Sequence, residues 1–212
     1  MKCFTTRILL TAACLLVLTT AAQAAEPNMD AIPKADPKTV AALKDLSHEI
    51  TLGKGKTDVV MVSDPFCVFC RMAYDHLAGE PDSVGKLLMV HVPLAGHPGS
   101  DMAGALAGYL ATKGKGREAI DLAYHMDEPE TNSYSEAGAI VYKEFQKAFP
   151  DELKSLSMKQ FIKIQFPILF DTSKAVRKLG LKGTPHIMAN GRHLNGYKAS
   201  WLDLILAAGK NG

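Results

Sequence analysis

Two cysteines separated by two residues are the clearest chemical feature of the sequence. Cys67 and Cys70 stand in the stretch SDPFCVFC, directly after the apolar run DVVMV. Such a pair can hold a metal ion, close a small disulfide loop, or exchange electrons with another disulfide. The other two cysteines of the chain are Cys3 and Cys14. The chemistry of the Cys67–Cys70 pair therefore depends on its place in the fold and on the compartment in which the protein works.

The N-terminal segment has the pattern of a secretory signal peptide. Lys2 and Arg7 lead into an apolar stretch over residues 8–18, and residues 22–24 read AQA, a small-x-small cleavage signal. The apolar core of about 11 residues is too short to span a bilayer core of roughly 30 Å. We therefore expect residues 1–24 to be removed on export to an oxidising compartment, where a lone CxxC can serve as a disulfide or a redox centre.

The composition sets the size and charge of the exported chain. Without Lys2 and Arg7 it carries 22 basic against 22 acidic residues. Nothing in this balance indicates nucleic acid or an acidic membrane surface as a partner. The remaining 188 residues suffice for one domain with a sizeable core, or for a core domain that carries a large insertion.

The elements around the cysteines follow a βαβ order. Residues 25–37 contain three prolines and predict an extended, mobile leader, and the apolar spacing over residues 38–49 predicts a short helix. The β-branched run at 58–63 predicts a strand buried on both faces. A helix over residues 67–80 and a second buried strand over 86–94 follow.

The second half of the chain is first helical and then mixed. Helical periodicity runs from residue 98 to about 180, two short strands joined by Asn190-Gly191 follow, and residues 200–210 predict an amphipathic helix. The order indicates an α/β core interrupted by an all-helical insertion. We expect a leader and short helix at 25–56, the core at 57–97 and 181–212, and the insertion at 98–180.

This order places Cys67 at the start of a helix and Cys70 one turn later. Their Cα atoms should then lie about 5 Å apart, inside the range of an unstrained disulfide. The free N–H groups of the helix start favour a thiolate at Cys67, while Cys70 should be the more buried and less acidic thiol. The pattern predicts that Cys67 attacks a disulfide and that Cys70 resolves the product.

Metal binding and a structural disulfide are the alternatives. His91 and His97 could complete a zinc site with the two cysteines, but the 20 residues between Cys70 and His91 exceed the usual spacing. A copper carrier that uses both thiolates suits soft Cu(I), although the methionines are scattered along the chain. A two-residue disulfide loop would constrain the unfolded chain little. Redox exchange without a metal or cofactor is the leading interpretation.

Two motifs together resemble a known family. SDPFCVFC ahead of a helix, joined to GLKGTPHIMANG near the C-terminus, resembles the thioredoxin fold of periplasmic Dsb proteins. The threonine before the proline, the phrase DPFC and the helix over 38–49 are most similar to the catalytic domain of the DsbC and DsbG disulfide isomerases. The resemblance implies a periplasmic thiol-disulfide oxidoreductase, with Pro185 in a cis bond beside the cysteines and the backbone of Thr184 pairing with substrate.

Further expectations concern partners and assembly. The resemblance implies unfolded or misoxidised exported proteins as substrates and a membrane redox partner that recycles the dithiol. Phe66 and Phe69 are expected to give the site an apolar rim that binds unfolded chains. The leader is too short for the dimerisation domain of those isomerases, so we expect a monomer. The Val68-Phe69 dipeptide lacks the imidazole of the strong oxidases, which predicts a less oxidising pair.

Overall fold

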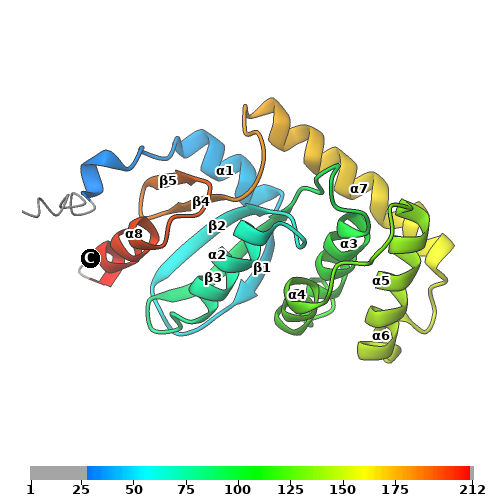
Figure 1. Cartoon of the computed structure of the whole chain (residues 1–212). Coiled ribbons are helices and arrows are strands. Elements are labelled where there is room, and N and C mark those ends of the chain that lie inside the picture. Colours follow the sequence, from blue (N-terminus) through cyan, green and yellow to red (C-terminus); the bar gives the residue numbers. More distant parts are fainter. Residues whose placement is uncertain (1–27, 211–212) are drawn as a thin grey trace, which may run out of the picture.

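A five-stranded mixed sheet forms the centre of the computed structural model, which describes residues 28–210 (Figure 1). The strand order is β1-β3-β2-β4-β5. Strands β2 and β3 are parallel, and every other neighbouring pair is antiparallel. The strands are β1 (His48–Thr51), β2 (Thr57–Ser63), β3 (Val84–His91), β4 (His186–Ala189) and β5 (Arg192–Asn195). The predicted signal peptide, with Cys3 and Cys14, lies outside the described residues.

The helices fall into two groups in Figure 1. The first group lies around the sheet, and the second, α3 to α7, gathers beside it as a helical body. The first group is η1 (Met29–Ala31), α1 (Pro37–Asp45), α2 (Val68–Ala78) and α8 (Ala199–Lys210). The second is α3 (Ser100–Ala111), α4 (Gly116–His125), α5 (Tyr134–Ala148), α6 (Pro150–Leu153) and α7 (Met158–Lys178).

Strand β2 is buried on both faces, as its β-branched sequence predicts. Val59 and Met61 join the core on the face that α2 and α8 cover. Val60 and Val62 point to the opposite face, where α1 contributes Leu43. Successive strand residues point to opposite sides of a sheet, so a continuous apolar run requires cover on both. Central β2 therefore carries the chain from the core directly to the cysteines.

The helical insertion is confirmed, and it shares its core with the sheet. Phe161 of α7 and Tyr124 of α4 belong to the same buried cluster as Met89 of β3. Helix α7 is continuous over 21 residues, with Pro167 inside it. It begins at a capping box, in which the Ser157 side chain accepts from the backbone of Gln160 and the Gln160 side chain accepts from the Ser157 N–H. Within residues 28–210, no helix combines the length and apolarity needed to cross a bilayer.

Two expectations about the N-terminal segment are wrong. The helix expected over residues 38–49 ends at Asp45, and residues 48–51 form β1, which pairs with β3. The described part of the leader is fixed by β5 rather than mobile: Ile32 is buried, and the N–H of His193 donates to the carbonyl of Pro33 at 2.9 Å. Both corrections come from contacts distant in sequence, which local apolar spacing does not report.

Candidate active site

The two cysteines lie at the junction of β2 and α2. Cys67 is the N-cap residue of α2, and its carbonyl accepts from the N–H of Cys70 at 2.9 Å. Cys67 is 7% exposed and Cys70 is fully buried. Both carry free thiols in this structure. The order of exposure is the one expected for an attacking and a resolving cysteine.

The buried carboxylate of Asp64 holds the turn that leads to Cys67. Its Oδ1 accepts from the backbone N–H groups of Phe66 at 2.7 Å and Cys67 at 3.1 Å. The same oxygen lies 3.0 Å from Nδ1 of His97, and Oδ2 accepts from the N–H of Leu94 at 2.7 Å. An Asp side chain that bonds the backbone two and three residues on is a common turn device. Asp64 thus ties the cysteine turn to the segment that follows β3.

Asp64 was not among the residues selected from the sequence. Its position three residues before the helix N-cap carried a signal, because Asp and Asn favour such turns. The contact with His97 had no such signal, since it joins residues from two different loops.

Arg71 fixes the other side of the turn. Its Nε donates to the carbonyl of Pro65 at 2.7 Å, and a terminal nitrogen donates to the carbonyl of Met126 at 2.8 Å. The guanidinium also lies over the ring of Phe66, 5.3 Å from its centre. The expectation that Phe66 presents an apolar rim is therefore wrong: the ring is 5% exposed and packs under Arg71.

The exposed apolar side chains beside the cysteines come from the first turns of α2. Phe69 is 54% exposed, and Val68 and Met72 are also exposed. Phe69 thus occupies the surface position that the sequence analysis expected of both phenylalanines. These three side chains form an apolar surface next to Cys67.

The loop before β4 brings Thr184 and Pro185 against Cys67, 117 residues away in sequence. The thiol of Cys67 faces the carbonyl oxygen of Thr184 at 3.7 Å. The Thr184–Pro185 bond is cis, as the resemblance implied. The hydroxyl of Thr184 is buried and has no hydrogen-bond partner among the described residues.

A pair of imidazoles supports this loop. Nε2 of His186 donates to the carbonyl of Lys182 at 3.1 Å, which leaves Nδ1 to accept from Nε2 of His193, also at 3.1 Å. Burial lowers the pKa of both rings, so the neutral forms required by this arrangement are favoured. The two histidines hold the loop from the side of β5.

The two thiols differ in acidity. A hydrogen bond from the Cys70 thiol is the largest of the effects that lower the pKa of Cys67 to about 5, and the backbone N–H groups of Cys70 and Phe69 and the Thr184 hydroxyl act in the same direction. Burial is the main cause that raises the pKa of Cys70 far above its usual value, and its bond to Cys67 adds to this. The N–H groups of the helix start lower the pKa of Cys67, as the sequence predicted, but the neighbouring Cys70 thiol lowers it more strongly.

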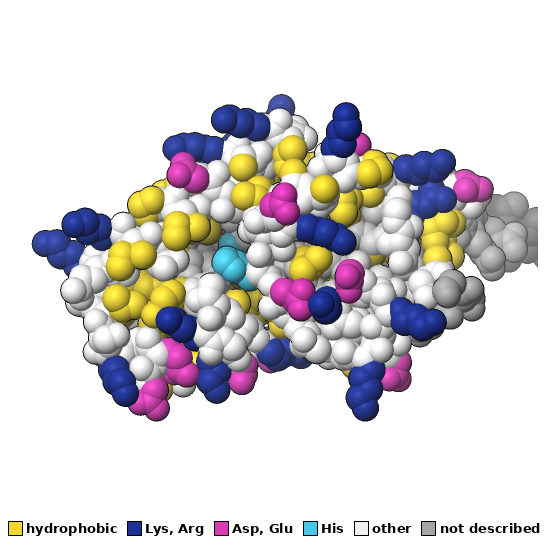
Figure 2. Space-filling view, turned by 180° about the vertical axis from the view of Figure 1, so that it is seen from behind, with side chains coloured by type: hydrophobic (Ala, Val, Ile, Leu, Met, Phe, Trp, Pro, Cys, Tyr) yellow, Lys and Arg dark blue, Asp and Glu magenta, His cyan; other side chains and the backbone are white. Residues whose placement is uncertain are grey.

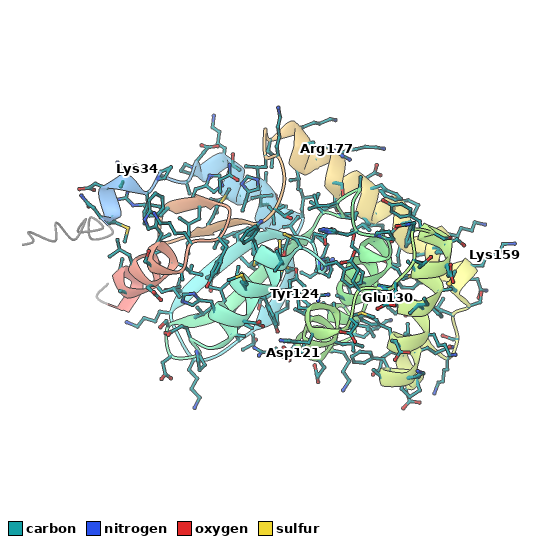
Figure 3. All side chains as sticks on the ribbon, in the orientation of Figure 1. Lys34, Asp121, Tyr124, Glu130, Lys159 and Arg177 are labelled. Carbon is teal, nitrogen blue, oxygen red and sulfur yellow. The ribbon has the colours of Figure 1, made fainter. Side chains whose placement is uncertain are left out.

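Beneath Cys70 lies a second buried polar contact. The hydroxyl of Tyr124, on α4, donates to Oγ of Ser63, the last residue of β2, at 2.6 Å. Figure 3 labels Tyr124 where the helical body meets the sheet. Ser63 in turn lowers the pKa of Cys70, opposing burial. The helical insertion thereby contributes a side chain to the surroundings of the thiols.

The two histidines considered as zinc ligands lie in different surroundings. His91 is buried in β3 beside the rings of His48 and Tyr124, and His97 faces Asp64. Over the part of the chain that the structure describes, no three His, Cys, Asp or Glu side chains gather in a metal-binding cluster.

Comparison with known proteins finds likeness in structure. No family model matches the chain, and no curated protein matches it. A periplasmic thioredoxin-like protein from Salmonella enterica serovar Typhimurium superposes with a TM-score of 0.60 at 16% identity, over 84% of this chain and 99% of that one. A thioredoxin-like oxidoreductase from Silicibacter pomeroyi DSS-3 covers the same shares with a TM-score of 0.54 at 18% identity.

A third solved structure carries a more specific name. The thiol-disulfide exchange protein alpha-DsbA2 from Wolbachia pipientis superposes with a TM-score of 0.51 at 17% identity, over 81% of this chain and 94% of that one. The chains that match include DsbA-type and ScsC proteins, and they do not single out the DsbC and DsbG isomerases. The chain has a thioredoxin-like fold with a helical insertion, similar to the fold of these solved structures.

Proposed function

We propose that this chain is an exported thiol-disulfide oxidoreductase that acts on protein disulfides through Cys67 and Cys70. The observation that carries the proposal is the placement of the two thiols: Cys67 caps α2 and faces the Thr184 carbonyl, while Cys70 is fully buried one turn on. In these surroundings the pKa of Cys67 is lowered to about 5 and that of Cys70 is raised. A thiolate that is available near neutral pH beside a protonated partner is what stepwise exchange requires.

The exchange proceeds in two balanced steps. The Cys67 thiolate attacks one sulfur of a substrate disulfide, which forms a mixed disulfide and releases the other substrate sulfur as a thiolate. Cys70, after loss of its proton, attacks the Cys67 sulfur, which forms the Cys67–Cys70 disulfide and releases the second substrate sulfur. The substrate gains two electrons and two protons. Run in reverse, the same steps oxidise a substrate dithiol.

The surroundings of Cys67 suit an unfolded protein segment. Val68, Phe69 and Met72 offer apolar contacts on one side, and the backbone of Thr184 lies on the other. We propose unfolded or misoxidised exported proteins as substrates, the periplasm as the compartment, and a membrane redox partner that recycles the dithiol. We propose that the protein works in the cell as an isomerase or a reductase. We also propose that it is a monomer, which light scattering would test.

Exchange is favoured over the copper carrier. A copper site would need both sulfurs as thiolates, whereas the burial that raises the pKa of Cys70 opposes loss of its proton. Metal content after purification under reducing conditions separates the two functions, because an oxidoreductase should contain no stoichiometric copper.

The deciding experiment is equilibration of the Cys67–Cys70 pair with glutathione, together with turnover of a scrambled disulfide substrate. The Cys67 pKa lies between the values of about 3.5 for DsbA and about 7 for thioredoxin. We expect a reduction potential between about −120 and −270 mV, the values of those two proteins. A pair that stays reduced throughout the glutathione range, with no turnover above that of a Cys67→Ser variant, would rule the function out.

A further inference from the structure

The outer face of α7 combines exposed apolar side chains with a concentration of positive charge. Ile164 is 51% exposed, Ile168 55% and Phe170 44%, and Pro167 between them is also exposed. The exposed basic side chains of the helix are Lys159, Lys163, Lys174, Arg177 and Lys178. The helix has one acidic residue, Asp171, which pairs with Lys174 at 3.1 Å. The whole exported chain is balanced in charge, so this excess is local to α7.

Most of these side chains lie on the side of the helix opposite its buried residues Phe161, Leu169 and Val176. By the 3.6-residue repeat this outer side carries Lys163, Ile164, Pro167, Phe170, Lys174 and Lys178. Ile168 lies on one flank of it, and Lys159 and Arg177 lie on the other. Lys159 and Arg177, 18 residues or five turns apart, point in the same direction. Figure 3 shows them near the two ends of α7, at the margin of the molecule.

The shape of this face is a ridge rather than a groove. A helix of 21 residues is about 31 Å long, and α7 runs along the upper edge of the molecule in Figure 1. From behind, Figure 2 shows dark blue basic side chains along the upper edge, with yellow apolar side chains beside them. A cavity of about 180 Å³ lies along the inner flank of α7, where Gln165, Ile168, Leu169 and Thr172 help to line it, and it reaches inward to His48 and His91. A flat partner can contact the full length of such a ridge.

We propose that the outer face of α7 binds the surface of an anionic phospholipid membrane. Apolar side chains flanked by Lys and Arg are the pattern of helices that lie in the membrane interface: the apolar groups enter the headgroup boundary and the cations meet lipid phosphates. A convex ridge fits a flat bilayer, whereas an acidic peptide segment would bind more readily in a concave groove. This inference is independent of the exchange activity and uses none of the residues around the thiols.

The test is co-sedimentation of the protein, purified after export, with vesicles of phosphatidylcholine containing about 30% phosphatidylglycerol. At about 50 mM salt the partition coefficient should be at least about tenfold higher than for pure phosphatidylcholine, and it should fall to the neutral-lipid value at about 0.5 M salt. Lys163→Glu/Lys178→Glu should reduce it about tenfold. The matched control, Lys54→Glu/Lys56→Glu, makes the same charge change on the loop between β1 and β2 and should change it less than about twofold.

The apolar contribution has its own variant and control. Ile164→Ser should weaken partition about threefold, whereas Ile140→Ser, at an exposed position of α5, should leave it unchanged. Equal partition to neutral and anionic vesicles, or equal losses in the control variants, would overturn the proposal. Binding to polyglutamate without binding to vesicles would also overturn it and would assign the face to an acidic protein. The circular dichroism and Cys67 alkylation of each variant should match those of the parent protein.

Discussion

Two loops meet at the thiol of Cys67, and they differ in how far their own polar groups are satisfied. In the cysteine loop, residues 64–67, the carboxylate of Asp64 accepts from three backbone N–H groups and faces His97. In the proline loop, residues 182–185, the Thr184 carbonyl has a long contact with the Cys67 sulfur and the Thr184 hydroxyl has no partner among described residues.

The difference indicates a division of labour. A turn whose buried donors are all paired holds its shape, because breaking any of those bonds leaves an unsatisfied group. The cysteine loop therefore positions the nucleophile. The proline loop has polar groups of Thr184 that can still form hydrogen bonds during exchange. The hydroxyl can donate to the Cys67 thiolate, and the backbone can pair with the backbone of a substrate.

The largest expected effect distinguishes the roles of Cys67, in the cysteine loop, and Cys70, in the helix that follows. Cys67→Ala should reduce exchange to background, because it removes the acidic thiol. Cys70→Ala should keep the attack and lose the resolution, so that mixed disulfides with substrates accumulate in the exporting cell. A non-reducing gel of trapped partners measures both variants. If Cys67→Ala traps more partners than Cys70→Ala, the assignment of attacker and resolver is reversed.

Much of this site follows from the sequence, and the exceptions have physical reasons. The strand, the helix start and the acidic Cys67 follow from a β-branched run that ends at a CxxC. Phe66 was placed on the surface because sequence does not show that Arg71, five residues on, would cover it. The turn bonds of Asp64 to Phe66 and Cys67 are local and could have been predicted, whereas its contacts with Leu94 and His97 could not, because these residues belong to a distant loop. Strand β1 was missed because only Ile50 of its four residues is buried, too few for an alternating pattern.

The acidity of Cys67 predicts how the reduced protein responds to pH. The folded pKa of about 5 lies below the value of about 8.5 for a free cysteine. The thiolate therefore stabilises the reduced fold fully above about pH 8.5, and this stabilisation is lost as pH falls toward 5, on the order of several kcal/mol in all. Urea unfolding of the reduced and oxidised proteins at pH 8.5 and 5 measures it. The oxidised protein has no thiolate and should lack this pH-dependent stabilisation, and so should the reduced Cys67→Ser variant.

Removing the carboxylate of Asp64 should destabilise the fold by about 3 kcal/mol, because it leaves buried N–H groups of Phe66, Cys67 and Leu94 unpaired. The variant is Asp64→Ala, measured by urea unfolding of the oxidised protein. His97→Ala is the matched control: it removes a partly exposed partner of the same carboxylate, leaves its three backbone N–H bonds in place, and should cost less than Asp64→Ala. Equal losses in the two variants would mean that the contact with His97, rather than the turn, is what Asp64 supplies.

The smallest expected effect tests whether the Thr184 hydroxyl of the proline loop stabilises the Cys67 thiolate. Thr184→Val replaces a hydroxyl with a methyl group of similar size, so it removes the donor that lowers the pKa of Cys67 by favouring the thiolate while keeping the packing. We expect the midpoint of Cys67 alkylation against pH to rise by less than about one unit, with the unfolding free energy of the oxidised protein unchanged or slightly higher, because a buried hydroxyl without a partner is itself unfavourable. Thr184→Ser, which keeps the hydroxyl, should restore the parent midpoint. An unshifted midpoint in Thr184→Val, or a marked loss of stability, would mean that the hydroxyl serves the fold rather than the thiolate, and the contrast between the two loops would not hold.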